Sequence, residues 1–364
     1  MKKFANAAVM TQERKPLEIV EYPLPEIQAE CVLVKIDCCT ICGSDIHSWI
    51  GRRKAPVPII LGHEIVGTIA EIGPGQVFDS FNRRLKVGDR ITWTIMDNCG
   101  KCYYCRQKGL MMKCKDLKKY GHDSCEESPH FTGGFAEYCY LTPGTCIVSI
   151  PDHVSSQEAA PANCALATIT AAWEEARIKP VENVLIQGAG ALGFYLSAYS
   201  RHNGCSNIIV TDIEDFRLEM IQEFGATHTI NVRDKSREDI VSNMQDLTNG
   251  FGVDCVFEVA GRPELIPLGL DCLRTGGRLI EVGNSFPNAD FKYDACKIVW
   301  RRLSLIGVHN YDARHLQQGV TFLAEAKTVF PFHKIATHTV GLDDINTGLE
   351  LAQSRETIRV AVLP

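Results

Sequence analysis

The 364-residue sequence predicts an α/β protein with two domains, one β-rich and one built on a doubly wound parallel sheet. The chain is longer than a single hydrophobic core usually allows, and its 45% hydrophobic and 23% charged residues are ordinary for a globular protein. Residues 31–148 form short β-rich runs separated by glycine and proline. After Ala167, strand patterns alternate with helix patterns, which is typical of a parallel sheet.

Each part of the chain has its own pattern. The β-rich part is expected to form a barrel-like unit, with strands at residues 32–36 and 65–72 among others. The alternating part has apolar strand patterns at residues 183–187, 207–211, 228–232, 253–259, 278–282 and 303–308. Residues 342–363 predict one amphipathic helix and a closing strand that returns to the first domain. We therefore expect residues 1–166 and 309–364 to form the β-rich domain, and residues 167–308 to form the parallel sheet.

Charge and hydropathy argue against two classes of partner. The formal net charge is −6 and the charges are interspersed, so nucleic acid is not an expected partner. No stretch reaches the roughly 18 apolar residues of a membrane span, and residues 1–13 lack the apolar core of a secretion signal. We therefore expect a cytoplasmic protein, where the sixteen cysteines are candidate metal ligands more than candidate disulfides.

A glycine-rich turn predicts a dinucleotide site. Gly188, Gly190 and Gly193 follow a predicted strand and open a predicted helix, where glycines permit a tight turn and a close approach of the backbone to pyrophosphate. Asp212 ends the next strand, where its carboxylate would bind the adenosine ribose and repel a 2′-phosphate, which favours NAD over NADP. The alternative is that the glycines only close a turn in an α/β core.

Two sets of residues suit zinc. The first is a short lobe whose four thiolates would close a tetrahedral shell, which predicts a structural site unless the thiols are unrelated buried groups: Cys99, Cys102, Cys105 and Cys114. The second is dispersed and consists of Cys42, His63 and Cys164. Two thiolates and an imidazole leave one position open, as at a catalytic zinc. Taken singly, each of the three could equally be a structural residue, so spacing alone leaves this alternative open.

The sequence resembles the zinc-containing medium-chain alcohol dehydrogenases over nearly its whole length. The shared features follow the family's order and come close to its spacing: Gly43-Ser-Asp-Ile-His47, Gly62-His-Glu64, the four-cysteine lobe, the turn from Gly188 to Gly193, Asp212 and Ile358-Arg359. The resemblance implies a GroES-like catalytic domain, a Rossmann domain, and a cleft for zinc and nicotinamide. It further implies two zinc ions per chain, NAD, an alcohol or aldehyde substrate, and a homo-oligomer, dimeric or tetrameric.

The resemblance also implies roles for single residues. Cys42, His63 and Cys164 would hold the catalytic zinc, Ser44 and His47 would relay the alcohol proton, and Asp45 and Glu64 would be carboxylates that support the ligands. Further residues would contact the cofactor: Thr168, Leu192 and Val282, with Arg359 near its pyrophosphate and Arg217 near its adenosine ribose. Two features depart from the family. Eight residues instead of the usual seven separate Cys105 from Cys114, and Gly43 stands where some members have a pyrophosphate-binding arginine.

A narrower similarity concerns the substrate. Residues 51–58, 118–122 and 161–164 are similar to alcohol dehydrogenases associated with phosphonate breakdown. Arg53 stands where members acting on neutral alcohols have an apolar residue, so Arg53 and Arg52 are expected to hold an anionic substrate tail, unless they form a solvated basic loop. Two alternatives remain: a dehydrogenase of neutral alicyclic alcohols or polyols, and a zinc-bearing cofactor-binding protein without turnover. A zinc-free quinone or enone reductase would lack Cys42, His63 and the four-cysteine lobe, which are all present.

Overall fold

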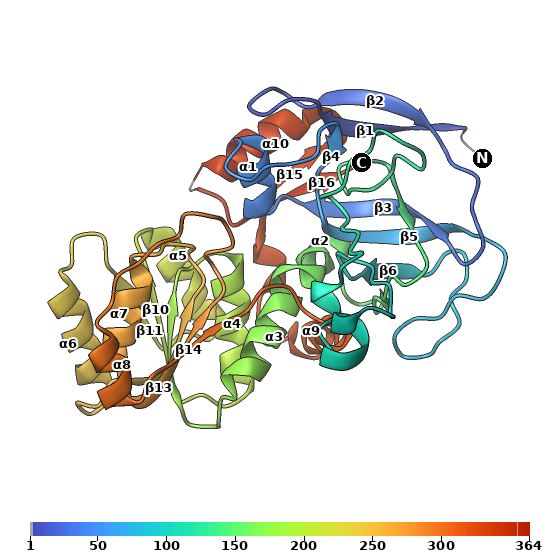
Figure 1. The fold of residues 1–364 in the computed structure, drawn as a ribbon. Helices are drawn as coiled ribbons and strands as arrows, with labels where there is room; N and C mark the ends of the chain where they lie inside the picture. The colour runs from blue at the N-terminus through green and yellow to red at the C-terminus, as the bar shows by residue number, and fades with distance from the viewer. Residues whose placement is uncertain (1–2, 355) are drawn as a thin grey trace. The chain divides into compact units, whose positions relative to one another are not determined.

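The computed structural model describes residues 3–354 and 356–364, which group into two compact units. The first unit contains the chain up to Ala167 together with Tyr311–Glu325 and Phe332–Pro364. The second unit contains Thr168–Asn310 and Ala326–Pro331 (Figure 1). Among the described residues, no helix is both long and apolar enough to cross a membrane.

The first unit is built on two sheets. In the part of the chain that the structure describes, the larger has seven strands in the order β15-β16-β3-β5-β6-β8, with β7 also paired to β3. Its pairs are antiparallel except for β15 with β16. The smaller sheet has the order β2-β1-β4. The strands are β1 (Phe4–Met10), β2 (Glu18–Pro23), β3 (Val32–Thr40), β4 (Ile59–Ile60), β5 (Glu64–Ile72), β6 (Arg90–Trp93), β7 (Tyr138–Leu141), β8 (Ile147–Ser149), β15 (Ala336–Gly341) and β16 (Arg359–Leu363).

Central strands of the larger sheet are buried over most of their length, since β3 and β5 contribute apolar side chains to one hydrophobic core. Burial of these β-branched residues holds the two strands in register, which places the residues after β3 beside those before β5. The helices and single turns of this unit are α1 (Gly43–Trp49), η1 (Tyr104–Lys108), η2 (Met111–Lys113), α2 (Ser156–Ala159), η3 (Ala160–Asn163), α9 (Ala313–Ala326), η5 (Phe332–Lys334), η6 (Leu342–Asp344) and α10 (Ile345–Gln353).

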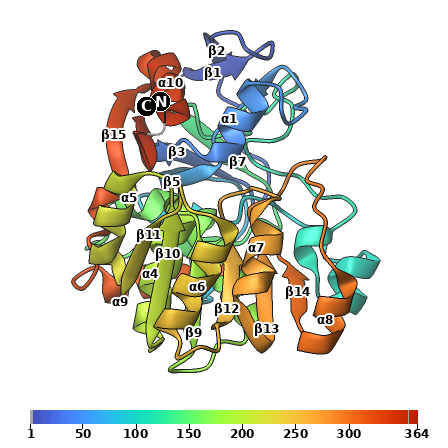
Figure 2. The ribbon, with the colours of Figure 1, turned by 90° about the vertical axis from the view of Figure 1, so that its left-hand side faces the viewer.

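The second unit is a doubly wound sheet, as the alternating sequence patterns predicted. Within the described residues its six strands are all parallel in the order β11-β10-β9-β12-β13-β14, which is the order 3-2-1-4-5-6 of dinucleotide-binding sheets. In Figure 2 the helices α6 and α7 lie in front of this sheet. The elements are α3 (Ala165–Ala176), β9 (Asn183–Gln187), α4 (Ala191–His202), β10 (Asn207–Asp212), α5 (Asp215–Met220), η4 (Ile221–Phe224), β11 (His228–Asn231), α6 (Arg237–Leu247), β12 (Val253–Glu258), α7 (Leu265–Cys272), β13 (Leu273–Glu281), α8 (Ala295–Arg301) and β14 (Ser304–Gly307).

Some boundaries differ from the sequence patterns. Strand β13 begins at Leu273, although the pattern predicted a start at residue 278. The pairing of β12 with β13 shifts register between Val253 and Cys255, and Gly276 has a φ of 76°, so this part of the strand has the sequence of a turn. Strands β1, β2 and β15 were not predicted. The helix and closing strand predicted for residues 342–363 are present as α10 and β16.

Candidate active site and metal centres

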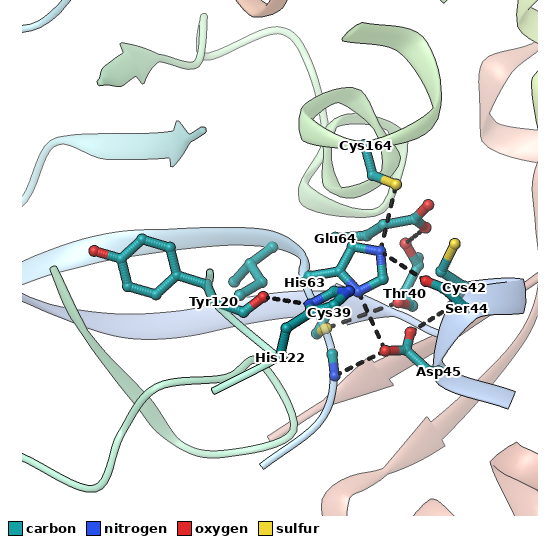
Figure 3. A network of polar contacts seen from close by, with 12 residues as sticks. Cys39, Thr40, Cys42, Ser44, Asp45, His63, Glu64, Tyr120, His122 and Cys164 are labelled. Carbon is teal, nitrogen blue, oxygen red and sulfur yellow. Dashed lines mark hydrogen bonds and ion pairs between the residues drawn. The ribbon is translucent and has the colours of Figure 1, made fainter. Parts of the chain in front are cut away.

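The fold brings the three dispersed zinc-ligand candidates together. Cys42 precedes α1, His63 precedes β5, and Cys164 follows η3. Together with Glu64, these residues offer ligand atoms that all lie within 4.8 Å of one another. Figure 3 shows them converging from different elements of the first unit. Two sulfur atoms and one imidazole nitrogen at this separation suit a tetrahedral zinc ion with a position left for another ligand.

Asp45 joins the segments that carry Cys42 and His63. Its Oδ1 lies 3.2 Å from Nδ1 of His63 and accepts the backbone N–H of Gly62 at 3.1 Å, while its Oδ2 accepts the backbone N–H of Cys42 at 2.8 Å. Burial lowers the pKa of His63, but Asp45 and Cys42 together outweigh burial and raise it to about 10. A carboxylate at Nδ1 fixes the tautomer that leaves Nε2 for a metal, and this Nε2 lies 3.4 Å from Sγ of Cys164.

Arg359 and Glu64 form a buried ion pair beside the sulfur atoms. The guanidinium donates to both carboxylate oxygens of Glu64 at 2.8 and 3.0 Å, and Thr40 donates to Glu64 at 2.6 Å. Burial raises the pKa of Glu64 to about 7, although the Arg359 charge opposes this. The pKa of Cys42 is well below its usual value, because the Cys164 thiol donates to it and the Arg359 charge favours a thiolate. Arg359 was expected near the pyrophosphate, and within the first unit its guanidinium binds Glu64.

Ser44 and His47, the expected proton relay, lie on α1. Oγ of Ser44 is 3.3 Å from Nε2 of His63, so the hydroxyl stands at the ligand cluster. His47 is three residues further along the helix, a spacing that puts both side chains on one face. Burial and the charge of Arg52 lower the pKa of His47, which favours a neutral imidazole that can accept a proton.

The four-cysteine lobe is compact. Sγ of Cys114 is 3.4 Å from Sγ of Cys99, and Sγ of Cys102 is 3.5 Å from Sγ of Cys105. All four sulfur atoms lie within 4.8 Å of one another. Backbone N–H groups of Lys115 and Cys105 lower the pKa of Cys102 to about 6. Four thiolates with amide donors suit a closed zinc shell without an open position.

The eight residues between Cys105 and Cys114 contain an unusual turn. Residues Tyr104–Lys108 form a π-helical turn, and Gly109 after it has a φ of 64°. A π turn holds more residues than an α turn of the same rise. The lobe therefore accommodates its eight-residue spacing while its sulfur atoms still converge.

The glycine turn in the second unit has the geometry expected of a nucleotide-binding loop. Gly188 has a φ of 113°, and a Cβ on Gly193 would lie 2.1 Å from the Gly188 carbonyl oxygen, so a side chain at either position would distort the turn. A Cβ on Gly190 would meet nothing within 4 Å, so this face of the turn is open. Asp212 accepts the Ala189 N–H at 2.7 Å, which ties the end of β10 to the turn.

The other expected cofactor residues of this unit lie on separate elements. Val282 follows β13, so that Val282, Asp212 and the glycine turn lie along the carboxyl edge of the parallel sheet, where nucleotides bind. The remaining three lie on helices: Thr168 on α3, Leu192 on α4 and Arg217 on α5.

Sequence reasoning missed a pair of acids at this edge. Glu258 ends β12 and Glu281 ends β13, and Glu258 is fully buried. Burial and the charge of Glu281 raise the pKa of Glu258 to about 8, and Asn284 donates to both carboxylates. Two acids that each terminate a predicted apolar strand were the available signal.

The two arginines after α1 differ in how far their side chains are exposed. The backbone N–H groups of Arg52 and Arg53 donate to the His47 carbonyl oxygen at 2.9 and 3.0 Å. Arg52 is exposed, whereas Arg53 is half-buried. Sequence reasoning did not assign a role to Lys119, which is half-buried, or to His122, whose ring centroid lies 4.8 Å from that of His63.

Comparisons with known proteins agree with this architecture. Residues 28–152 match the alcohol dehydrogenase GroES-like domain, and residues 191–325 match the zinc-binding dehydrogenase domain. Sorbitol dehydrogenase of Bacillus subtilis is 32% identical over 99% of this chain and 97% of its own length. L-threonine 3-dehydrogenase of Shewanella loihica is 29% identical over 94% of each chain.

A solved structure gives the same result. The crystal structure of an alcohol dehydrogenase from Thermotoga maritima aligns with a TM-score of 0.95 at 31% identity and covers 99% of each chain. The predicted fold class, a GroES-like β-rich part with a Rossmann sheet, is confirmed. The chain therefore belongs to the zinc-dependent medium-chain alcohol dehydrogenase family, oxidoreductases that act on alcohols and polyols.

Proposed function

We propose that this chain transfers a hydride between an alcohol and NAD, at a zinc site formed by Cys42, His63 and Cys164. The observation that carries the proposal is the convergence of these three donors within 4.8 Å, with Asp45 orienting the imidazole. The domain assignment follows: residues 1–166 and 309–364 provide the catalytic site, and residues 167–308 bind the cofactor.

The side chains of the first unit support proton transfer during alcohol oxidation. When bound, zinc supplies Lewis-acid chemistry that makes an alcohol hydroxyl easier to deprotonate, and NAD accepts the hydride. Ser44 stands 3.3 Å from the ligand imidazole and accepts the alcohol proton. His47 then carries this proton away, because its lowered pKa keeps it neutral at pH 7. Buried Asp45 holds His63 in one tautomer throughout.

We assign a second, structural zinc to the four-cysteine lobe, and NAD to the edge of the parallel sheet. The assignment of NAD in preference to NADP rests on Asp212, whose carboxylate stands beside the glycine turn. Thr168, Leu192, Val282, Arg217 and Arg359 complete the proposed cofactor contacts.

A neutral polyol substrate is the second candidate. It is favoured by the 32% identity to a sorbitol dehydrogenase over almost the whole chain. A protein that binds zinc and cofactor without turnover would have no use for the hydroxyl of Ser44 at the ligand cluster, which disfavours that alternative.

We also propose that the protein is a cytoplasmic homo-oligomer. Strand β14 is at the edge of its sheet, and the side chains of Val299 and Trp300 before it are 71% and 81% exposed. An edge strand next to exposed apolar side chains is a common site of subunit contact. Trp300→Glu should lower the mass measured by sedimentation equilibrium, and an unchanged mass would assign the contact elsewhere.

The activity is tested by absorbance at the reduced-nicotinamide band with a panel of neutral, polyhydric and anionic alcohols and with NAD or NADP. The expected result is NAD reduction by at least one alcohol, with about two zinc ions per chain. Asp212→Gly should reduce the preference for NAD over NADP by roughly 10-fold or more, because the repulsion of the 2′-phosphate is lost. Equal turnover with NAD and NADP in the unaltered enzyme would refute the role of Asp212.

A further inference from the structure

We infer that Arg53 and Lys119 form a receptor for an oxyanion group of the substrate, next to the zinc ligands of the first unit. The inference rests on the proposed function, because it names the substrate class of the same site. It assigns this role to Lys119, to which the sequence analysis gave no role of its own, and excludes Arg52, whose side chain is exposed.

Arg53 is a half-buried cation near the ligand cluster. Among the described residues, its guanidinium forms no ion pair and no hydrogen bond with a protein acceptor. Its charge interacts with Asp45 and with the sulfur atoms of Cys42 and Cys164, yet Asp45 already accepts three hydrogen bonds. Once the thiolates hold zinc, the metal balances their charge. A half-buried guanidinium without a protein anion favours binding an external one.

Lys119 lies on a loop that packs against the segment containing His63. A Cβ on Gly121 would lie 2.4 Å from the Gly62 carbonyl oxygen and 3.1 Å from Cβ of His63, so the two backbones are in close contact. The His122 ring packs edge-on against the His63 ring, as Figure 3 shows, and its Nδ1 lies 2.9 Å from the Tyr120 carbonyl oxygen. The start of the same loop forms a bridge from Lys119 to Met96. The backbone that carries Lys119 is therefore fixed against the segment that contains His63.

The positive charges of Lys119 and Arg53 repel each other. Burial, followed by the charge of Arg53, lowers the pKa of Lys119 to about 8. Repulsion between two half-buried cations costs free energy that a bound anion would offset. A guanidinium and an ammonium together suit a phosphonate, phosphate or carboxylate group.

The binding test measures inorganic phosphate and acetate by calorimetry, on zinc-loaded enzyme without nucleotide. The variants are Arg53→Gln and Lys119→Gln, and the controls are Lys54→Gln and Lys118→Gln, which alter exposed neighbours. The unaltered enzyme should bind at least one anion, each variant should weaken binding roughly 10-fold or more, and each control should stay within about 2-fold. Arg53→Lys should retain part of the binding. Absence of anion binding to the unaltered enzyme, or equal loss in variants and controls, would overturn the receptor.

The kinetic test compares 2-hydroxyethylphosphonate and 3-hydroxypropionate with neutral 1-propanol. Both variants should raise KM for an anionic alcohol roughly 10-fold or more and leave KM for 1-propanol and for NAD unchanged. A rise in KM for NAD alone would indicate that the two cations bind the cofactor phosphates, which would refute the proposal. Unfolding temperature and zinc content show whether a variant has folded. If Arg53→Gln does not fold, the comparison is made with Arg53→Lys and Lys119→Gln. Anion binding without turnover of any alcohol would refute the proposed function and leave the receptor standing.

Discussion

The two candidate zinc sites of the first unit are assembled in opposite ways. The four-cysteine lobe takes all its ligands from residues 99–114. The dispersed site takes its ligands from residues 42, 63 and 164, which lie before α1, before β5 and after η3. A local lobe needs little more than its own turns, whereas the dispersed site exists only when the larger sheet has formed.

The groups that support the sulfur atoms differ in the same way. In the lobe, the backbone N–H groups of Cys99 and Asp116 lie 3.3 and 3.4 Å from Sγ of Cys114. In the dispersed site, the guanidinium of Arg359 donates to Sγ of Cys42 at 3.7 Å, and the Asp45 carboxylate supports the His63 imidazole. Backbone donors survive most substitutions, whereas side-chain donors do not. The dispersed site should therefore be the more sensitive of the two to mutation.

The largest expected effect is that of Cys42→Ala. Turnover should fall by roughly 1,000-fold or more, because the open site loses a ligand, and zinc should fall from about two to about one per chain. Metal analysis and absorbance at the reduced-nicotinamide band measure the two effects. Cys38→Ala, which removes a buried thiol outside both ligand groups, is the control and should keep both zinc ions. A Cys42 variant that still turns over would place the catalytic metal elsewhere.

The next effect is on stability. Glu64→Gln removes the partner of Arg359 in a pair whose side chains are 0% and 11% exposed, which should lower the free energy of unfolding by about 3–5 kcal/mol. The control is Glu214→Gln, whose pair with Arg233 is more exposed, at 21% and 51%, and should contribute less than about 1 kcal/mol. Urea unfolding measures both. Equal losses in the free energy of unfolding would mean that burial of an ion pair does not determine its contribution to stability.

Removing one cysteine ligand of the four-cysteine lobe should have a smaller effect on stability and leave turnover nearly unchanged. Cys102→Ala should remove one zinc ion and lower the unfolding temperature by about 5 °C, because metal binding there stabilises a local turn. Turnover should stay within about 3-fold of the unaltered enzyme. A Cys102 variant as inactive as the Cys42 variant would show that the two sites are not independent.

The smallest effect concerns the proton relay. The Arg52 charge contributes to the lowered pKa of His47, so Arg52→Gln should raise that pKa slightly. Oxidation that needs neutral His47 rises with pH through this pKa, so the rising limb of the kcat/KM profile should move to higher pH. An NMR titration of the imidazole provides the same measurement without turnover. If the rising limb of the kcat/KM profile moves to lower pH, the limb reports the titration of a group other than His47.

Local patterns accounted for most of the fold. The strand at residues 183–187 was predicted with the bounds of β9, because it is apolar and ends at a glycine turn. The lobe was equally visible, since its four thiols lie close in the sequence. The early start of β13 was missed because Gly276 and Gly277 have the sequence of a turn, and only pairing with β12 extends the strand.

Contacts between distant residues could not be predicted from the sequence. Nothing near Glu64 indicates that Arg359 is its partner, because the register of β16, β3 and β5 brings them together. Likewise, Lys119 appeared only as one of two adjacent lysines, and burial distinguishes it from exposed Lys118. Burial and strand register were the missing information in both cases.

The position of β16 has a consequence for synthesis of the protein on the ribosome. In the larger sheet β16 lies between β15 and β3, yet it follows the whole of the second unit in the sequence. The second unit is complete except for a short segment once residue 310 has emerged, and domains generally fold as units during translation. The larger sheet, by contrast, is complete only after residues 359–363 have been synthesised. The pairing of Arg359 with Glu64 also requires these residues. A nascent chain would therefore acquire its nucleotide-binding sheet before Arg359 could pair with Glu64 beside the dispersed metal site.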